Sequence, residues 1–334
     1  MTIAIVKIFN SLLLLFTLIN RNEEYYRRIR LIIYLGAVIF ILFISLRVDG
    51  PDLYIHKQQF NHPDRVYIFD KGYIELNRIA AAIFPDFRYV TLLISLTSIL
   101  AIYKSAKYFN VNYQHATLFY LIHLMVLRDF VQLRFGLATS IFLISLTINN
   151  FYLRIITYLI SISIHASVII LVIILEILRI WQKKRKLLTF LLVPCIFLLA
   201  ANVQYFFFLD PRVMAYLNWK VEARSTSSHL TYLVFQLTLF SLFYINRGFS
   251  EIINLNLYLS IFGLTLYLAF WDLTYIQGRI AGIFFTLYPL ALSSIFSKQT
   301  RIDKGITGIL TLAILFSIIL RPDFKEIFQL MSWL

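Results

Sequence analysis

Arginine, aspartate and histidine side chains occur at the ends of, or inside, segments that are otherwise apolar enough to enter a membrane. The chain has 334 residues, of which 60% are hydrophobic and only 14% are charged. A charged side chain near the centre of a bilayer costs at least about 2.5 kcal/mol, so several of them predict a polar site inside the membrane or at its surface. The patches centre on Arg47 with Asp49 and Asp52, on Arg128 with Arg134, on His165, and on Arg279.

Two of these arginines begin predicted membrane helices in settings that suit an anionic substrate. Arg134 shares a helical face with Leu137 and Ala138. The small residues that follow it let a neighbouring helix approach closely: Gly136, Ala138, Thr139 and Ser140. Arg279 begins a later helix beside Gly278. A guanidinium group binds phosphate through two hydrogen bonds and stays charged when water is excluded. The pair therefore predicts a pyrophosphate site, although arginines that only anchor a helix at the interface have the same pattern.

The candidate proton acceptors are two carboxylates and one imidazole. Asp49 and Asp52 follow the second predicted span, where they could accept a proton from a sugar hydroxyl or orient it, or simply form a solvated turn. His165 is either such a base or a packed side chain hydrogen-bonded to Ser161, one helical turn earlier. Metal binding is not expected, because no second histidine or cysteine lies three or four residues from His165.

The apolar pattern predicts an all-α polytopic membrane protein with a single transmembrane domain over residues 1–334. Its two substantial outer loops, about 47–88 and 210–229, are too short for a separate soluble catalytic domain. Apolar runs of membrane-spanning length recur along the whole chain. We expect about ten full spans, near residues 3–19, 31–46, 89–103, 112–127, 134–149, 187–209, 230–246, 252–271, 279–297 and 305–320.

One apolar segment, residues 155–178, does not fit the alternation of the spans. Arg154 precedes it and the basic cluster 179–186 follows it, and the positive-inside rule places both in the cytoplasm. A pair of short helices broken near residues 165–167 lets the chain enter and leave on the same side. Irregular backbone at membrane depth is tolerated only where it is buried in protein or lines a wet cavity. The broken pair is therefore a candidate for the site.

The first outer loop contains an amphipathic pattern over residues 72–84, which predicts a helix lying along the outer membrane surface. The formal net charge of +14 does not indicate nucleic-acid binding, because basic residues gather in 20–30 and 179–186, where they set topology. A single cysteine, Cys195, excludes a disulfide within the chain. The predicted apolar face of the amphipathic helix comprises Tyr73, Leu76, Ile79, Ala80 and Ile83.

The same patches, in this order, resemble the EpsG-like group of Wzy-type polysaccharide polymerases over about residues 30–290. The chain departs from the group's pattern in having Leu53 for an aromatic residue, His56 for a tyrosine and Phe135 for a glutamine. These departures affect the details of the acceptor site. The matching stretches are residues 47–52, 70–76, 134–138, 165–167 and 279–285.

The resemblance implies a membrane glycosyltransferase of GT-C-like architecture that needs no cofactor and works on the periplasmic face of the bacterial inner membrane. It implies transfer of a glycan, with inversion, from undecaprenyl pyrophosphate to the non-reducing end of another undecaprenyl-pyrophosphate-linked repeat unit. Expected partners are these lipid-linked donors and acceptors, membrane lipids, a chain-length regulator and a flippase. A lipid-linked oligosaccharide flippase, an O-antigen ligase and a membrane acyltransferase are the alternatives.

On this reading the arginines bind pyrophosphate and an acidic residue or a histidine activates the acceptor hydroxyl. Arg134 and Arg279 would hold the donor, and Arg47 or Arg128 the acceptor. Asp52 is the first candidate for the base and His165 the second. The predicted catalytic residues are Asp52, His165 and Asp49, and the predicted substrate-binding residues are Arg47, Arg128, Arg134, Arg279, Tyr73 and Gln132.

Overall fold

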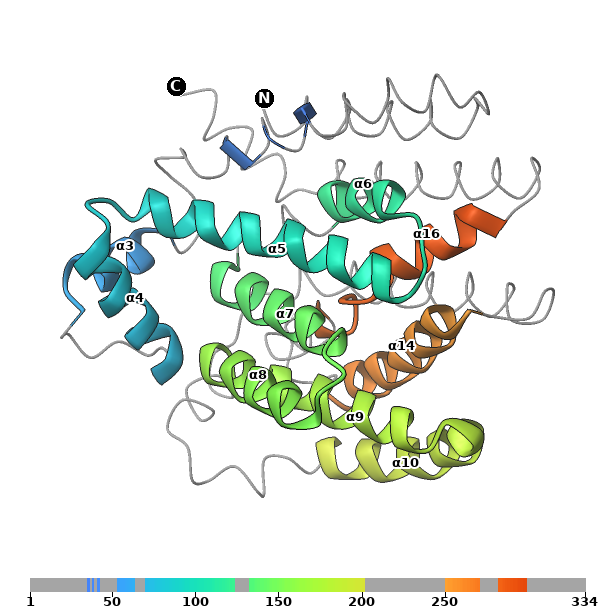
Figure 1. The fold of residues 1–334 in the computed structure, drawn as a ribbon. Helices are drawn as coiled ribbons and strands as arrows, with labels where there is room; N and C mark the ends of the chain where they lie inside the picture. The colour runs from blue at the N-terminus through green and yellow to red at the C-terminus, as the bar shows by residue number, and fades with distance from the viewer. Residues whose placement is uncertain are drawn as a thin grey trace, which may run out of the picture.

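The computed structural model describes residues 53–63, 70–123, 132–201, 250–270 and 282–298, together with a few positions between 35 and 42. These residues form helices and turns, and no strand occurs among them, so the all-α class holds for the part described (Figure 1). Two of the described helices are long and apolar enough to cross a membrane: α5 (Arg88–Tyr108) and α14 (Glu251–Ala269). The number of about ten spans stays a prediction.

Most described helices lie where the apolar pattern predicts them, but the span expected over 279–297 is interrupted after Ile283. Residues 284–287 form turns, with the amide of Phe285 bonded to the carbonyl of Gly282. Pro289 has no amide hydrogen, which removes one hydrogen bond that a continuous helix needs at this point. The other described helices that lie largely within predicted spans are α6 (Tyr113–His123), α7 (Leu133–Leu146), α10 (Arg185–Ala201) and α16 (Tyr288–Lys298).

Helix α7 packs between α5 and α8 (Phe151–Ile164), as Figure 1 shows. Small hydroxyl residues make this close packing possible and connect the three helices by hydrogen bonds. The hydroxyl of Ser140 on α7 donates to that of Ser98 on α5 at 2.9 Å, and the hydroxyl of Ser161 on α8 donates to the carbonyl of Ala138 at 2.6 Å. The small residues after Arg134 thus face protein, as predicted.

The outer faces of α8, α9 (Val168–Ile180) and α10 expose large apolar side chains. Tyr152, Ile180 and Phe190 are 77%, 74% and 76% exposed. Water-soluble proteins rarely leave a continuous apolar surface uncovered, whereas lipid covers it without cost. These faces therefore suit contact with a bilayer.

The segment predicted to form the first outer loop contains two helices rather than one. Helix α4 (Lys71–Ile83) lies within one residue of the predicted segment, but α3 (Leu53–Asn61) was not predicted, because its sequence is largely polar. The apolar face predicted for α4 is in part buried against protein and in part exposed. Ile79 and Ile83 are 61% and 66% exposed, whereas the polar Asn77 is fully buried. Asn77 lies on the same side of α4 as the buried Tyr73 and Ala80, and the exposed isoleucines suit the membrane contact predicted for this helix.

The broken helix pair is present, as predicted. Helix α8 ends at Ile164, His165 is extended, and α9 begins at Val168. With 14 and 13 residues, each helix is about 20 Å long, shorter than a hydrocarbon core of about 30 Å. The turn therefore lies inside the membrane's depth if the open end of the pair is at one surface.

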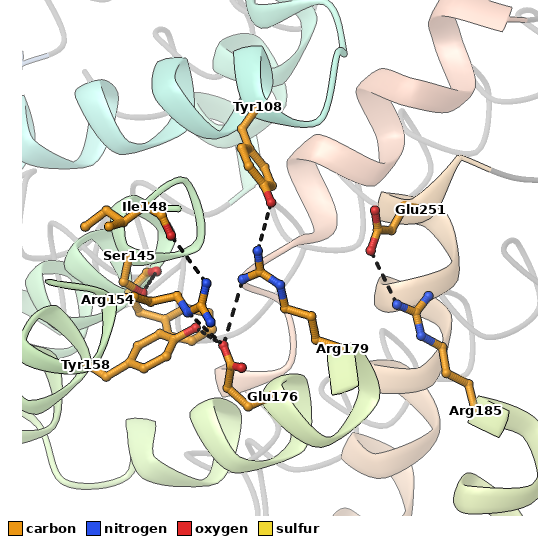
Figure 2. A network of polar contacts seen from close by, with 10 residues as sticks. Tyr108, Ser145, Ile148, Arg154, Tyr158, Glu176, Arg179, Arg185 and Glu251 are labelled. Carbon is orange, nitrogen blue, oxygen red and sulfur yellow. Dashed lines mark hydrogen bonds and ion pairs between the residues drawn. The ribbon is translucent and has the colours of Figure 1, made fainter. Parts of the chain in front are cut away.

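One carboxylate connects α8 and α9 near the open end of this hairpin, where α8 begins and α9 ends (Figure 2). Glu176 Oε1 on α9 accepts a hydrogen bond from the Tyr158 hydroxyl at 2.6 Å and lies 3.4 Å from Arg154 Nε, both on α8. It also lies 3.9 Å from Arg179 Nη1, and Arg179 Nη2 donates to the Tyr108 hydroxyl on α5 at 2.9 Å. Arg154 and Arg179 are therefore at the same end of the hairpin, which agrees with the prediction that both ends face one side.

A second ion pair in Figure 2 connects α10 to α14. Arg185 Nη2 lies 3.3 Å from Glu251 Oε1, and Arg185 Nε donates to the carbonyl of Leu178 on α9 at 2.7 Å. Both interactions involve the basic cluster predicted to be cytoplasmic. This end of the described structure is therefore held by paired charges.

Replacing Glu176 with alanine should lower stability, because Arg154 and Arg179 would lose their common counter-charge in partly buried surroundings. We expect a loss of about 2 kcal/mol, between the values for exposed and buried pairs. The measurement is the thermal unfolding midpoint of the detergent-solubilised protein. The matched control is Glu75→Ala, whose ion pair with Arg78 is about half exposed. Equal midpoints for the two variants would contradict a structural role for Glu176.

Candidate functional site

Asp70 forms the centre of the charged cluster at the turn of the hairpin. It is the N-cap residue of α4, yet its side chain makes no capping hydrogen bond. Instead, Asp70 Oδ2 lies 3.3 Å from Arg134 Nη1 on α7 and 3.4 Å from His165 Nδ1 at the end of α8. A capping hydrogen bond stabilises a helix by about 1 kcal/mol. The Asp70 carboxylate does not provide this stabilisation. It instead contacts Arg134 and His165, which are 64 and 95 positions further along the chain.

All three side chains are largely withdrawn from solvent. The exposed fractions are 16% for Asp70, 17% for Arg134 and 20% for His165. Charges at this depth interact more strongly than surface charges, because less water screens them.

Tyr73 and His56 extend the cluster on the side of the first outer loop. The Arg134 guanidinium carbon lies 5.9 Å from the centre of the Tyr73 ring, within the range of a cation–π contact. The Tyr73 hydroxyl and His56 Nδ1 are 3.0 Å apart, and both residues are buried. The His56 ring stacks on Phe87 at 6.3 Å. Tyr73 is therefore fixed at both its ring and its hydroxyl, and it limits the positions that the guanidinium can take.

The surroundings of His165 differ from the packed arrangement considered from sequence. The Ser161 hydroxyl donates to the Ala138 carbonyl, and the imidazole approaches Asp70 instead. Phe135 lies against the imidazole edge to face, with ring centres 5.5 Å apart. A carboxylate beside Nδ1 favours the tautomer with the proton on that nitrogen, which makes Nε2 the basic one. His165 can thus accept a proton from a hydroxyl at Nε2.

Three helices begin beside the cluster. Helix α4 starts directly after Asp70, α7 starts one residue before Arg134, and α9 starts three residues after His165. The N-terminus of a helix carries a partial positive charge and amide groups that can bind an anion. Together with Arg134, these helix ends favour a negatively charged group at this position, and Asp70 is such a group.

Close approach of α4 to α8 brings Asp70 to His165. A Cβ atom added to Gly72 would lie 2.7 Å from the carbonyl carbon of Ser163 on α8, which is too short for a real contact. Glycine is therefore required here, because it alone lets the two backbones come so close.

The Asp86–Arg88 pair provides a comparison from the start of α5. Arg88 donates to Asp86 Oδ2 from Nε at 2.9 Å and from Nη2 at 2.7 Å, and its side chain is 51% exposed. Hydrogen bonds from the side chain and backbone amide of Arg88 lower the pKa of Asp86. This pair is shorter, bidentate and solvated. The Asp70–Arg134 pair is longer and largely buried, so the two pairs differ in how easily another anion could replace the carboxylate.

The structure brings together three of the predicted site residues, Tyr73, Arg134 and His165, and their roles stay predictions. Gln132 is exposed at the N-cap of α7. The remaining candidates lie outside the described residues: Arg47, Asp49, Asp52, Arg128 and Arg279.

Two residues of the cluster were not among the predicted site residues. Asp70 appeared only as part of a motif, because an aspartate before an amphipathic helix is explained by capping. His56 appeared only as a departure from a motif. Among the described residues, no group of three or more histidine, cysteine, aspartate or glutamate side chains could hold a metal ion.

A helical membrane protein with a buried charged cluster at a broken helix pair is the class that this fold and site define. Comparison with known families identifies the family within this class. The chain belongs to the EpsG family, whose model matches residues 30–321. The resemblance inferred from the motifs is thereby confirmed. Membership indicates a glycosyltransferase-like or polymerase-related role in polysaccharide biosynthesis at a membrane. Searches of curated proteins and of solved structures returned no significant match.

Replacing Gly72 with alanine should push α4 away from α8 and destabilise it by roughly 1–3 kcal/mol, the usual effect of overpacking. Hydrogen–deuterium exchange should then become faster in the peptide that covers α4. Gly282→Ala is the control, because a Cβ atom at that position meets nothing within 4 Å. Unchanged exchange over α4 in Gly72→Ala would contradict the requirement for close contact.

Proposed function

We propose that this protein is a polysaccharide repeat-unit polymerase of the bacterial inner membrane. It transfers a glycan from undecaprenyl pyrophosphate to the non-reducing end of another undecaprenyl-pyrophosphate-linked repeat unit. The reaction takes place on the periplasmic face and inverts the anomeric centre. EpsG family membership supports the reaction class, and the exposed apolar faces of α8, α9 and α10 support the membrane setting.

The observation that carries the proposal is the position of Arg134. Its guanidinium lies largely buried between the Asp70 carboxylate and the Tyr73 ring, beside helix N-termini. Charge develops on the pyrophosphate as it leaves, and a fixed cation in a water-poor site stabilises such charge effectively. Arg279, outside the described residues, would supply the second cation for the donor, and Arg47 or Arg128 would hold the acceptor.

The topology supports a periplasmic site. Arg154, Arg179 and the basic residues after α9 lie at the open end of the hairpin, and basic segments next to membrane helices stay in the cytoplasm. The turn with His165 is about 20 Å further into the membrane. It therefore lies nearer the periplasmic surface, where a lipid pyrophosphate head group and a sugar chain are accessible. A flippase and a chain-length regulator are the partners that this reaction would need.

The test is polymerisation by the purified protein in detergent with its undecaprenyl-pyrophosphate-linked repeat unit, resolved as a ladder on a gel. We expect wild-type protein to form the ladder without nucleotide sugar or ATP. Arg134→Ala should reduce the rate about 100-fold or more, the usual cost of removing a group that stabilises developing charge. Arg134→Lys should restore activity only in part, because an ammonium group lacks the two parallel donors of a guanidinium.

Arg88→Ala is the matched control. Arg88 also lies at the start of a helix and pairs with an aspartate, but it is exposed. It should leave the ladder unchanged. A full-length ladder from folded Arg134→Ala protein, or no ladder from folded wild-type protein with an intact repeat unit, would contradict the proposed function.

A further inference from the structure

Asp70 lies at a position where the surrounding groups would also bind an anionic ligand. It is an anion beside a buried arginine, a histidine and the start of three helices. These are the groups that also suit a phosphate. The same residue is needed near His165 if that imidazole is to gain a proton, because a neighbouring carboxylate stabilises the cation that forms. Asp70 therefore contacts two residues with different proposed roles: Arg134 in binding phosphate and His165 in accepting a proton.

The contacts of Asp70 with Arg134 and with His165 are both long. Its Oδ2 atom lies 3.3 Å from Arg134 and 3.4 Å from His165. Charge-assisted hydrogen bonds of full strength are about 2.7–2.9 Å long. The exposed Asp86–Arg88 pair reaches 2.7 Å in the same protein. A single oxygen shared at longer distance between two donors is a contact that a doubly charged anion can displace from one of them.

We propose that Arg134 exchanges its counter-ion during the reaction: Asp70 holds it in the empty protein, and the donor's pyrophosphate takes it over on binding. Asp70 then pairs with His165 alone. This inference rests on the proposed function, and it identifies Asp70 as a positioning residue and His165 as the base. The exchange is possible because the two donors approach the same carboxylate oxygen from different helices.

The chemical step then balances as follows. The acceptor hydroxyl gives its proton to His165 Nε2 while its oxygen forms a bond to the anomeric carbon of the donor. The bond from that carbon to the pyrophosphate oxygen breaks, and the electron pair leaves with undecaprenyl pyrophosphate, whose charge Arg134 neutralises. The Asp70 carboxylate neutralises the imidazolium. The imidazolium returns its proton to water at the membrane surface, which restores the base.

This arrangement makes an unusual prediction for the removal of Asp70. An uncharged residue at position 70 removes the carboxylate that competes with the ligand for Arg134, so pyrophosphate should bind more tightly. If Asp70 occupies Arg134 in 80–90% of empty molecules, affinity rises about five- to tenfold when it is removed. Turnover should fall at the same time, since His165 loses its carboxylate. A residue that merely holds the fold together would weaken both binding and turnover.

The experiment measures binding of undecaprenyl pyrophosphate, without sugar, to the purified full-length protein, alongside the polymerisation rate. The variants are Asp70→Asn and Asp70→Ser, because both new residues are good N-caps and should leave α4 in place. Asp86→Asn is the control, since Asp86 is paired with an arginine but exposed. We expect about fivefold tighter binding and at least tenfold slower polymerisation in both Asp70 variants, and neither change in Asp86→Asn.

Unchanged or weaker binding of undecaprenyl pyrophosphate in folded Asp70 variants would overturn the exchange. So would tighter binding with wild-type turnover, because Asp70 would then have no role with the base. Failure of the proposed function looks different: wild-type protein would bind undecaprenyl pyrophosphate no better than Arg134→Ala does, or would form no polymer. The binding comparison between wild type and the Asp70 variants decides the exchange even when polymer formation fails.

Discussion

Because the chain turns back at residues 165–167, the ends of several helices meet beside that turn, and the rest of the described structure follows from covering it. Backbone groups buried in such a turn must be bonded within the protein. The amide of His165 bonds to the carbonyl of Ser161, and that of Val168 bonds to the carbonyl of His165. Helix α7 lies alongside, and α4 reaches the end of α8 through Gly72. The elements that shield the turn are those that bring Asp70 and Arg134 to His165.

A buried arginine constrains the structure in a similar way. An unpaired charge withdrawn from water is costly, so Arg134 needs an anion whether or not substrate is bound. Asp70 supplies that anion from a loop helix rather than from a neighbouring span. A carboxylate on α4 can yield to a ligand with a small displacement of one helix end, whereas a carboxylate within a packed span could not. The position of the counter-ion therefore decides whether the arginine can be used for binding.

Much of the fold was predictable because it depends on local pattern. The apolar runs identified α5, α7 and α14, and the conflict between Arg154 and the basic cluster 179–186 predicted the broken pair. Of the site, the sequence identified Arg134 and His165 as polar groups in apolar surroundings. Their connection through Asp70 was not predictable, since it joins residues 64 and 95 positions apart and an aspartate before a helix is ordinarily a capping residue. The burial of Asn77 on α4 was not predictable, because tertiary packing decides which polar side chains of an amphipathic helix are covered by protein.

The carboxylates of Glu176 and Asp70 lie at opposite ends of the hairpin and have different roles. Glu176 accepts a 2.6 Å hydrogen bond from Tyr158 and has an arginine from each helix of the pair nearby, which makes its network a support for the fold. Asp70 Oδ2 lies 3.3 Å from Arg134 and 3.4 Å from His165, so neither of these two contacts is as short. Short hydrogen bonds with all partners in place stabilise a structural network. A site that must bind pyrophosphate needs ion pairs that the ligand can replace. The longer contacts of Asp70 therefore favour the turn of the hairpin, rather than its basic end, as the place where substrate binds.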